Sequence, residues 1–467
     1  MSLQRPASTA WRLLAVLALS AIGTPGPAQA QGGLRVEGLT VENHFPNRLV
    51  FNARAISPDA PLERAVLNYW QVDIFASPSR TRIPVTVSPS NDASLTHTWD
   101  TGGQTVVPNT PVVYQWEVWA ADGSHYLGPE QVVHYRDTRF DWDVRETEAV
   151  AVWTHDRPST FGLRVFDIAS QAIDRQRQLF GVNVELQIQI LIYNSFDEFA
   201  AWHGTVGEFI GGQAFPGFGV TTQIVSLAGP QDGWLLDVIP HEISHLYFAQ
   251  VTNNPTVSVP VWLNEGVASY NEFGTQALAL ARVERVAEQG DLVPLSSLTM
   301  GFGSHNEARA RLAYDEAVSA VTYMIGAYGQ EGLAALLAAY REGLPSEMAF
   351  ERALGTNVGQ FEADWASWAG SPEGAYATAT PWPTLAFRAS PTLPTFGGGG
   401  NQPASATYLA RDPTANPPAT PTSSPTPNPP NETTAPPLGW VVLAGGLLGA
   451  SVGWWLVRRL IQDRPAG

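Results

Sequence analysis

The stretch WLLDVIPHEISHLYFAQV, residues 234–251, has apolar residues at helical spacing and carries two histidines four residues apart. Residues i and i+4 of a helix lie on one face, so His241 and His245 can direct ring nitrogens at one point. Glu242 flanks them. Two imidazoles with an adjacent carboxylate in this order are typical of a catalytic metal site with a general base.

Pro240 lies inside the same stretch and leaves two interpretations of the helix open. A proline within a helix removes one hydrogen bond and kinks the helix. Alternatively, Asp237 is the N-cap of a helix that begins there, which would place Pro240 in the first turn, where no donor is missed.

A catalytic zinc needs a third protein ligand and an open position. The chain has no cysteine, so the ligands must be His and carboxylate side chains. Twenty residues after His245 the segment VWLNEGVASYNEFG (261–274) offers Glu265, with Glu272 two helical turns further on. Periodicity alone does not choose between these carboxylates, and either one could be a solvated helix residue.

HEISHLYF followed by WLNEGVASYNE resembles the gluzincin metallopeptidases, in particular the peptidase MA-like domains, and is distantly similar to the membrane alanyl aminopeptidase family. The resemblance implies a thermolysin-like zincin fold and one Zn(II) ion per chain, held by His241, His245 and Glu265. It also implies that Glu272 orients the site from behind the ligands.

A further similarity lies in LAYDEAVSAVTYMIGAYG (312–329), which resembles the aminopeptidase stretch whose tyrosine donates to the oxyanion. By that resemblance the residue is Tyr314. The alternative is that Tyr314 is a packing aromatic of a helix.

These residues predict a peptidase in which a zinc-activated water attacks the peptide bond, with Glu242 as general base. The chain lacks the G-x-M-E-N segment with which the aminopeptidases grip the free amine of a substrate. A strand expected at FIGGQAFPGFGV (209–220) would instead pair with the backbone of an extended peptide, which favours an endopeptidase over an aminopeptidase. A catalytically inactive binding or adhesion protein and a hydrolase of non-peptide amides are the alternatives.

The predicted fold class is α+β. Short alternating runs in residues 33–136 predict an immunoglobulin-like or fibronectin-like β-sandwich, with strands expected at 34–41, 48–56, 67–75, 111–124 and 130–135. Tyr114, Trp116 and Val118 should share one face of such a strand, and Asp122-Gly123 is a hairpin signal. We expect this domain to act as a spacer or to present substrate.

Residues 137–275 mix helical and strand periodicity, as expected of the α/β zincin core. Helices are expected at 161–181 and 196–202, and strands at 186–195 and 218–227. Residues 276–371 are almost wholly helical in pattern and predict a helical subdomain that ends the folded part.

The two ends of the chain predict export and anchoring. Residues 1–30 have the basic, apolar and small-residue regions of a signal peptide. Residues 438–457 are long and apolar enough for a single transmembrane helix, and Arg458 and Arg459 follow at once. The prediction is a single-pass cell-membrane protein with an extracytoplasmic catalytic domain and a cytoplasmic tail at 458–467.

Between them, residues 372–437 are rich in Pro, Thr and Gly and predict a disordered stalk. Gly445, Gly449 and Gly453 line one face of the predicted membrane helix, which either supports weak homodimerisation or reflects small residues tolerated in lipid. The formal charge of −17 argues against a nucleic-acid partner, because phosphates would be repelled.

Overall fold

The computed structural model describes residues 33–77, 79–203, 211–227, 232–274, 276–298, 302 and 307–372, all of which belong to one compact unit. The predicted signal peptide, transmembrane helix with its three glycines, cytoplasmic tail and nearly all of the stalk lie outside these residues. Among the helices of the described part, none is long and apolar enough to cross a membrane.

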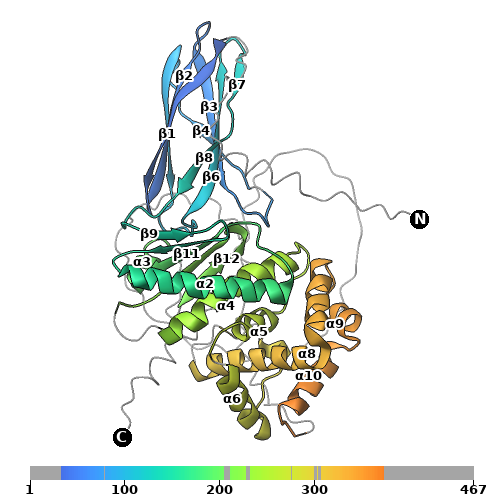
Figure 1. Ribbon diagram of the computed structural model, residues 1–467. Coiled ribbons are helices and arrows are strands. Elements are labelled where there is room, and N and C mark those ends of the chain that lie inside the picture. Colours follow the sequence, from blue (N-terminus) through green and yellow to red (C-terminus); the bar gives the residue numbers. More distant parts are fainter. Residues whose placement is uncertain are drawn as a thin grey trace, which may run out of the picture. The chain divides into compact units, whose positions relative to one another are not determined.

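The described N-terminal residues form two antiparallel sheets (Figure 1). The first has the order β1-β2-β5, with β1 at Arg35–His44, β2 at Arg48–Ile56 and β5 at Asp92–Asp100. The second has the order β4-β3-β6-β7, with β8 also paired to β6. Its strands are β3 (Leu62–Gln71), β4 (Thr81–Val85), β6 (Thr110–Ala120), β7 (His125–Leu127) and β8 (Gln131–Tyr135).

One apolar core joins these sheets. Along β6 the buried side chains of Tyr114, Trp116 and Val118 alternate with residues of the opposite face, as the sequence predicts. Phe51 of β2 stacks on Tyr69 of β3 with ring centroids 5.6 Å apart. The sequence analysis missed β4 and β5, because most of their side chains are polar and partly or fully exposed, so hydrophobic alternation is weak there.

A third sheet follows in the chain and has the strand order β12-β13-β11-β10-β9. Its strands are β9 (Asp143–Glu146), β10 (Val150–Thr154), β11 (Ile188–Tyr193), β12 (Gly212–Phe215) and β13 (Val220–Ile224). β10, β11 and β13 are parallel, whereas the outer strands β9 and β12 are antiparallel to their neighbours. The edge strand expected within 209–220 is β12, which is shorter than expected because the 3-10 turn η4 (Pro216–Phe218) ends it and leads into β13.

Two helices pack against one face of this sheet: α2 (Ser159–Phe180) and α4 (Asp232–Thr252), which lie side by side (Figure 1). α3 (Phe196–Ala200) buries Phe199 in the core on the other face. The helices and strands expected between 161 and 227 correspond to α2, β11, α3 and β13. α2 buries one side only, which made its helical periodicity readable, whereas β11 and β13 are buried on both faces.

α4 begins at Asp232, so Pro240 is inside the helix and the alternative of Asp237 as N-cap is wrong. Because a proline has no N–H, the carbonyl of Leu236 one turn earlier lacks its usual helical donor. The backbone N–H of Phe273 donates to that carbonyl at 3.1 Å. A segment 33 residues later in the chain therefore compensates for the helix bond that Pro240 removes.

The C-terminal described part is helical, as predicted. It contains α5 (Val261–Tyr270), α6 (Gln276–Glu288), α7 (Leu295–Leu298), α8 (Glu307–Arg341), α9 (Ser346–Leu354) and α10 (Val358–Trp368). α8 is interrupted by non-helical backbone at Gly329. These helices share a separate apolar core, and α5 packs on both α4 and α8. The mixed α+β class with N-terminal sheets and a helical C-terminal region is thus confirmed.

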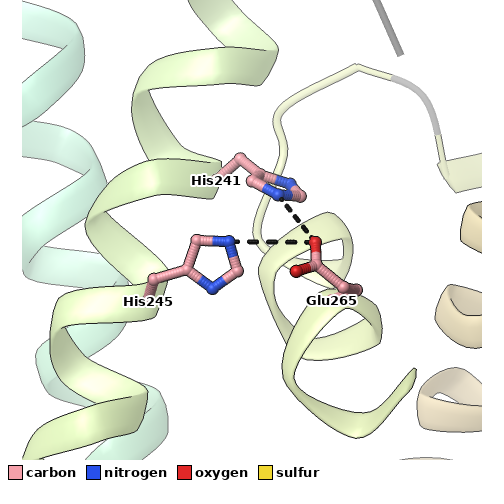
Figure 2. A group of neighbouring side chains, drawn as sticks. All are labelled: His241, His245 and Glu265. Carbon is pink, nitrogen blue, oxygen red and sulfur yellow. Dashed lines mark ion pairs between the residues drawn. The ribbon is translucent and has the colours of Figure 1, made fainter. Parts of the chain in front are cut away.

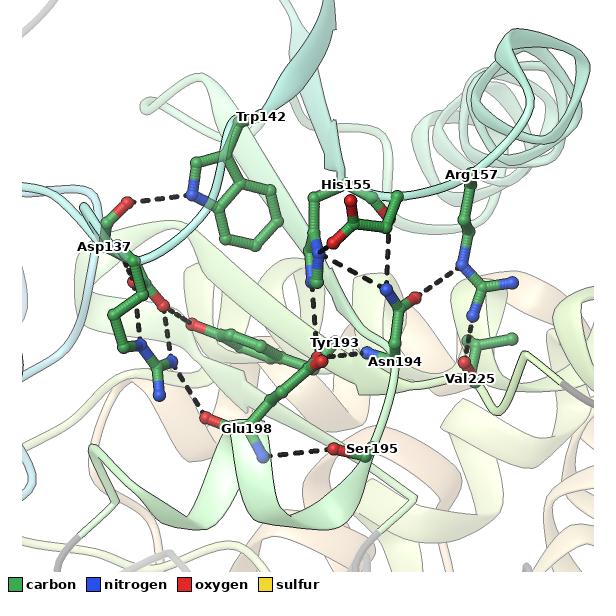
Figure 3. Close-up of polar contacts among 11 residues, drawn as sticks. Asp137, Trp142, His155, Arg157, Tyr193, Asn194, Ser195, Glu198 and Val225 are labelled. Atoms are coloured by element: carbon green, nitrogen blue, oxygen red, sulfur yellow. Dashed lines mark hydrogen bonds and ion pairs between the residues drawn. The ribbon is translucent and has the colours of Figure 1, made fainter.

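A polar network ties the segment after β8 to the carboxyl ends of the parallel strands (Figure 3). Arg139 donates to both carboxylate oxygens of Asp137, at 3.0 and 2.6 Å, and to the carbonyl of Glu198 at 2.8 Å. The hydroxyl of Tyr193, at the end of β11, donates to Asp137 at 3.2 Å. His155, just after β10, lies 3.3 Å from the Glu198 carboxylate. These contacts fix the segment between β8 and β9, which links the N-terminal sheets to the third sheet.

Candidate metal centre

Helices α4 and α5 bring two imidazoles and one carboxylate to a common point (Figure 2). His241 and His245 project from successive turns of α4, with ring centroids 4.9 Å apart, and Glu265 faces them from α5. One ligand atom from each residue lies within 4.8 Å of the others. The Glu265 Oε2 atom is 3.3 Å from His241 Nε2 and 3.8 Å from His245 Nε2.

The other nitrogen of each ring is held by a side chain that can only accept there. His241 Nδ1 donates to a Glu272 carboxylate oxygen at 3.0 Å, and His245 Nδ1 donates to the Asn264 amide oxygen at 3.0 Å. A neutral imidazole that donates through Nδ1 has its lone pair on Nε2. When both rings are neutral in this tautomer, both lone pairs point toward Glu265, as a metal ligand requires.

The structure separates the two carboxylates that periodicity left equivalent. α5 ends at Tyr270, so Glu272 lies beyond the helix and not two turns along its face. From that position it reaches the outer nitrogen of His241, whereas Glu265 faces the inner nitrogens of both rings. The sequence analysis missed Asn264, whose only signal is its position next to Glu265.

Burial and charge set the protonation of the two histidines differently. Burial by itself lowers the pKa of His241, but hydrogen bonds and charge from Glu265 and Glu272 raise it to about 10. Burial lowers the pKa of His245, whose outer partner is a neutral amide. Binding of a cation between the rings therefore has to displace a proton from His241, so metal affinity should fall with falling pH.

Glu242 lies on the side of α4 that faces β12 and is only 1% exposed. Burial, with a smaller contribution from the charge of Glu265, raises the pKa of Glu242 to about 8. Its Oε2 atom has no hydrogen-bond partner among the described residues. A carboxyl group with a pKa near neutrality and a free oxygen is suited to accept and return a proton.

Tyr314, on α8, lies near His241, and the centroids of the two rings are 6.3 Å apart. Burial and the charges of Glu265, Glu242 and Glu272 raise its pKa well above the usual value, so it remains a neutral hydroxyl donor. The hydroxyl is buried and has no partner in the described part of the chain. Phe302 packs edge-on against the ring at 4.9 Å.

The donor set fits a small divalent cation that prefers nitrogen and oxygen ligands. Two imidazole Nε2 atoms and one carboxylate, each of them buried, converge from two helices, and their outer hydrogen bonds fix the ring orientations. This is the ligand type and count of a catalytic zinc site. His241, His245 and Glu265 would hold the ion. Glu272 and Asn264 would orient the two imidazoles by accepting from their Nδ1 atoms.

Residues 168–371 match the Peptidase MA superfamily. The matched range begins within α2 and ends after α10, so it contains every residue of the candidate metal centre and none of the N-terminal sheets. No curated protein sequence matches the chain.

Solved structures with detectable similarity include M1 zinc metallopeptidases. The M1 zinc metallopeptidase of Deinococcus radiodurans bound to a Tyr-Ser-Ala substrate is 12% identical, with 74% of this chain and 97% of that chain covered and a TM-score of 0.31. A two-domain M1 zinc metallopeptidase bound to L-arginine is 12% identical, with 75% and 97% covered and a TM-score of 0.34.

Wild-type OgpA of Akkermansia muciniphila is 8% identical, with 23% of this chain covered and a TM-score of 0.18. The chain spans only 29% of the length of that protein.

Proposed function

We propose that the protein is a zinc-dependent peptidase. The observation that carries this proposal is the convergence of ligand atoms of His241, His245 and Glu265 within 4.8 Å. They lie next to the buried carboxyl group of Glu242, one oxygen of which has no hydrogen-bond partner among the described residues. The match of residues 168–371 to the Peptidase MA superfamily supports the same class of activity.

Each side chain has a role in this proposal that follows from its position. A zinc ion bound by the three ligands would lower the pKa of a water molecule and polarise the scissile carbonyl. Glu242 accepts the proton of the attacking water and returns it to the leaving amine. Tyr314 donates a hydrogen bond from its hydroxyl to the oxygen on which negative charge develops, a role open to a buried hydroxyl that has no partner in the described part of the chain.

The edge strand β12 supports endopeptidase activity within this proposal. The carbonyl of Gly211 accepts from the N–H of Ile224 in β13, and pairing alternates along antiparallel strands. The backbone polar groups of Gly212 and Ala214 therefore face away from β13, where an extended peptide can add as a further strand. The residues of β12 are Gly-Gln-Ala-Phe, so the strand offers no carboxylate to bind a free amine.

The proposed setting is the outer face of a membrane. It rests on sequence features outside the described residues: a signal peptide at 1–30, a Pro-rich stalk at 372–437 and an apolar segment at 438–457 followed by Arg458 and Arg459. In this arrangement the catalytic domain is extracytoplasmic and held on a tether.

The test is Glu242→Gln in the purified chain. The substitution keeps the size of the side chain and all three metal ligands, so zinc content should match that of the parent while peptide hydrolysis falls by about 10²- to 10⁴-fold. Chelation of the parent should abolish activity, and added zinc should restore it. Parent-like cleavage by the Gln variant would refute Glu242 as the base.

The same preparation distinguishes the alternatives. Peptides blocked at both termini are cleaved by an endopeptidase and resist an aminopeptidase. A parent protein that binds zinc tightly and cleaves neither blocked nor free peptides would support an inactive binding protein instead.

A further inference from the structure

The position of Glu242 depends on a residue with no side chain. A Cβ atom built on Gly212 would lie 2.7 Å from Glu242 Oε1 and 3.1 Å from the Glu242 carboxyl carbon. Side-chain carbons essentially never approach neighbours to less than 3.0 Å. The carboxylate of Glu242 thus occupies space that any other residue at 212 would fill.

The need for glycine at this position is one of space and not of backbone conformation. Gly212 is a strand residue and is not among the described glycines with positive φ, such as Gly219 directly after η4. An alanine could therefore adopt the same backbone conformation, and strands generally lose stability when they contain glycine. A residue that is unfavourable for the strand but necessary for a neighbouring carboxylate indicates a functional constraint.

Gly212 also belongs to the edge of β12 on which the proposed substrate pairing depends. Its backbone N–H and C=O face away from β13, and the space left by its missing side chain faces Glu242 on α4. One residue thus brings the edge of the strand and the general base together. A side chain at 212 would push either the strand or the carboxylate away.

We propose that Gly212 is a positioning residue of the active site, which sets how closely the Glu242 carboxylate approaches the edge of β12. This inference rests on the proposed peptidase function for its kinetic consequence, but the contact itself does not. Gly212 touches no reacting atom and acts only through Glu242.

The kinetic test uses Gly212→Ala in the full chain. We expect kcat to fall by about 10- to 100-fold, because a displacement of about 1 Å at a catalytic group costs this much. KM should change by less than about threefold and zinc content should be unchanged, because neither substrate pairing nor the ligands is removed.

Two second-site variants separate positioning from simple packing. The added methyl group would also meet Val238 Cγ2 at 3.0 Å. Glu242→Asp withdraws the carboxylate by one methylene group, so in that background Gly212→Ala should cost less than about threefold. Val238→Ala relieves only the apolar contact, so in that background Gly212→Ala should still cause the full loss of kcat. Restoration by Val238→Ala, or an unchanged kcat in Gly212→Ala, would overturn the proposal.

A measurement independent of activity tests the contact itself. Gly212→Ala should lower the thermal midpoint of the parent and of Glu242→Gln, which keeps the size of the side chain. It should leave the midpoint of Glu242→Ala unchanged or raised, since the space is then free. Equal lowering in all three backgrounds would refute the contact, whether or not the protein cleaves peptides. If Gly212→Ala alone does not fold, recovery of folding by the added Glu242→Ala supports the proposal and continued misfolding opposes it.

Discussion

Replacing Gly266 with alanine tests how closely α5 must pack on α8 to place Glu265. A Cβ atom at 266 would lie 2.5 Å from the carbonyl oxygen of Ala317, 2.8 Å from its carbonyl carbon and 2.9 Å from Val321 Cγ2. Because the nearest atoms are backbone, they cannot rotate away. Restoring an ordinary carbon–oxygen contact of about 3.4 Å requires α5 and α8 to separate by roughly 0.9 Å.

Two effects of opposite sign compete in Gly266→Ala. Alanine is favoured over glycine inside a helix by about 1 kcal/mol. Overpacking of a close helix–helix contact costs about 1–3 kcal/mol, and a clash with backbone belongs at the upper end. We therefore expect a net loss of about 2 kcal/mol in the free energy of unfolding.

The matched control is Gly326→Ala on α8, where an added Cβ meets nothing within 4 Å. There only the higher helix propensity of alanine acts, and we expect the free energy of unfolding to rise by up to about 1 kcal/mol. Urea unfolding of both variants measures the difference. Because Glu265 and Asn264 precede residue 266 on α5, zinc affinity measured by competition with a chelator should fall about tenfold or more in Gly266→Ala only. Equal stability of the two variants would refute the close-packing argument.

Two further predictions concern buried ionisable side chains away from the metal centre. Asp137→Asn removes the carboxylate that Arg139 binds through two hydrogen bonds, and leaves a mostly buried guanidinium without its counter-charge. Urea unfolding should show a loss of about 3 kcal/mol, and a loss below about 1 kcal/mol would contradict the role of this pair. Burial raises the pKa of Glu316 well above its usual value, so the folded chain retains a proton that the unfolded chain loses above about pH 4.5. The stability of the parent should therefore fall as pH rises from about 4.5 toward the raised pKa of Glu316, and Glu316→Gln should remove this part of the pH dependence. Parallel curves of thermal midpoint against pH for the parent and Glu316→Gln would exclude this contribution of Glu316.

The local patterns in the sequence were sufficient for most regular elements. The helix that carries His241 and His245 could be predicted because four-residue spacing places side chains on one helical face whatever surrounds the helix. The hairpin signal Asp122-Gly123 likewise corresponds to the turn between β6 and β7, where Gly123 has φ of 86°. β5 was missed because its pattern of exposed polar residues resembles a loop until strand β2 pairs with it.

The continuity of α4 could not be derived from its own residues. Local rules leave a proline in a helix open to two interpretations, and the one that holds depends on Phe273, which donates to the carbonyl that Pro240 leaves unpaired. Such compensation comes from a segment distant in the sequence. Only packing brings the two together.

The sequence by itself determined which chemical groups are present and which of them share a helical face: two imidazoles four residues apart, a carboxylate beside the first, and carboxylates in the following helical segment. The tertiary structure alone decided that Glu265 faces the inner nitrogens while Glu272 and Asn264 hold the outer ones. It also revealed Gly212, whose contribution is the space it leaves for Glu242. The physical reason is that periodicity specifies direction around one helix axis, whereas convergence on a point requires the distance and rotation between elements, which are set by close packing.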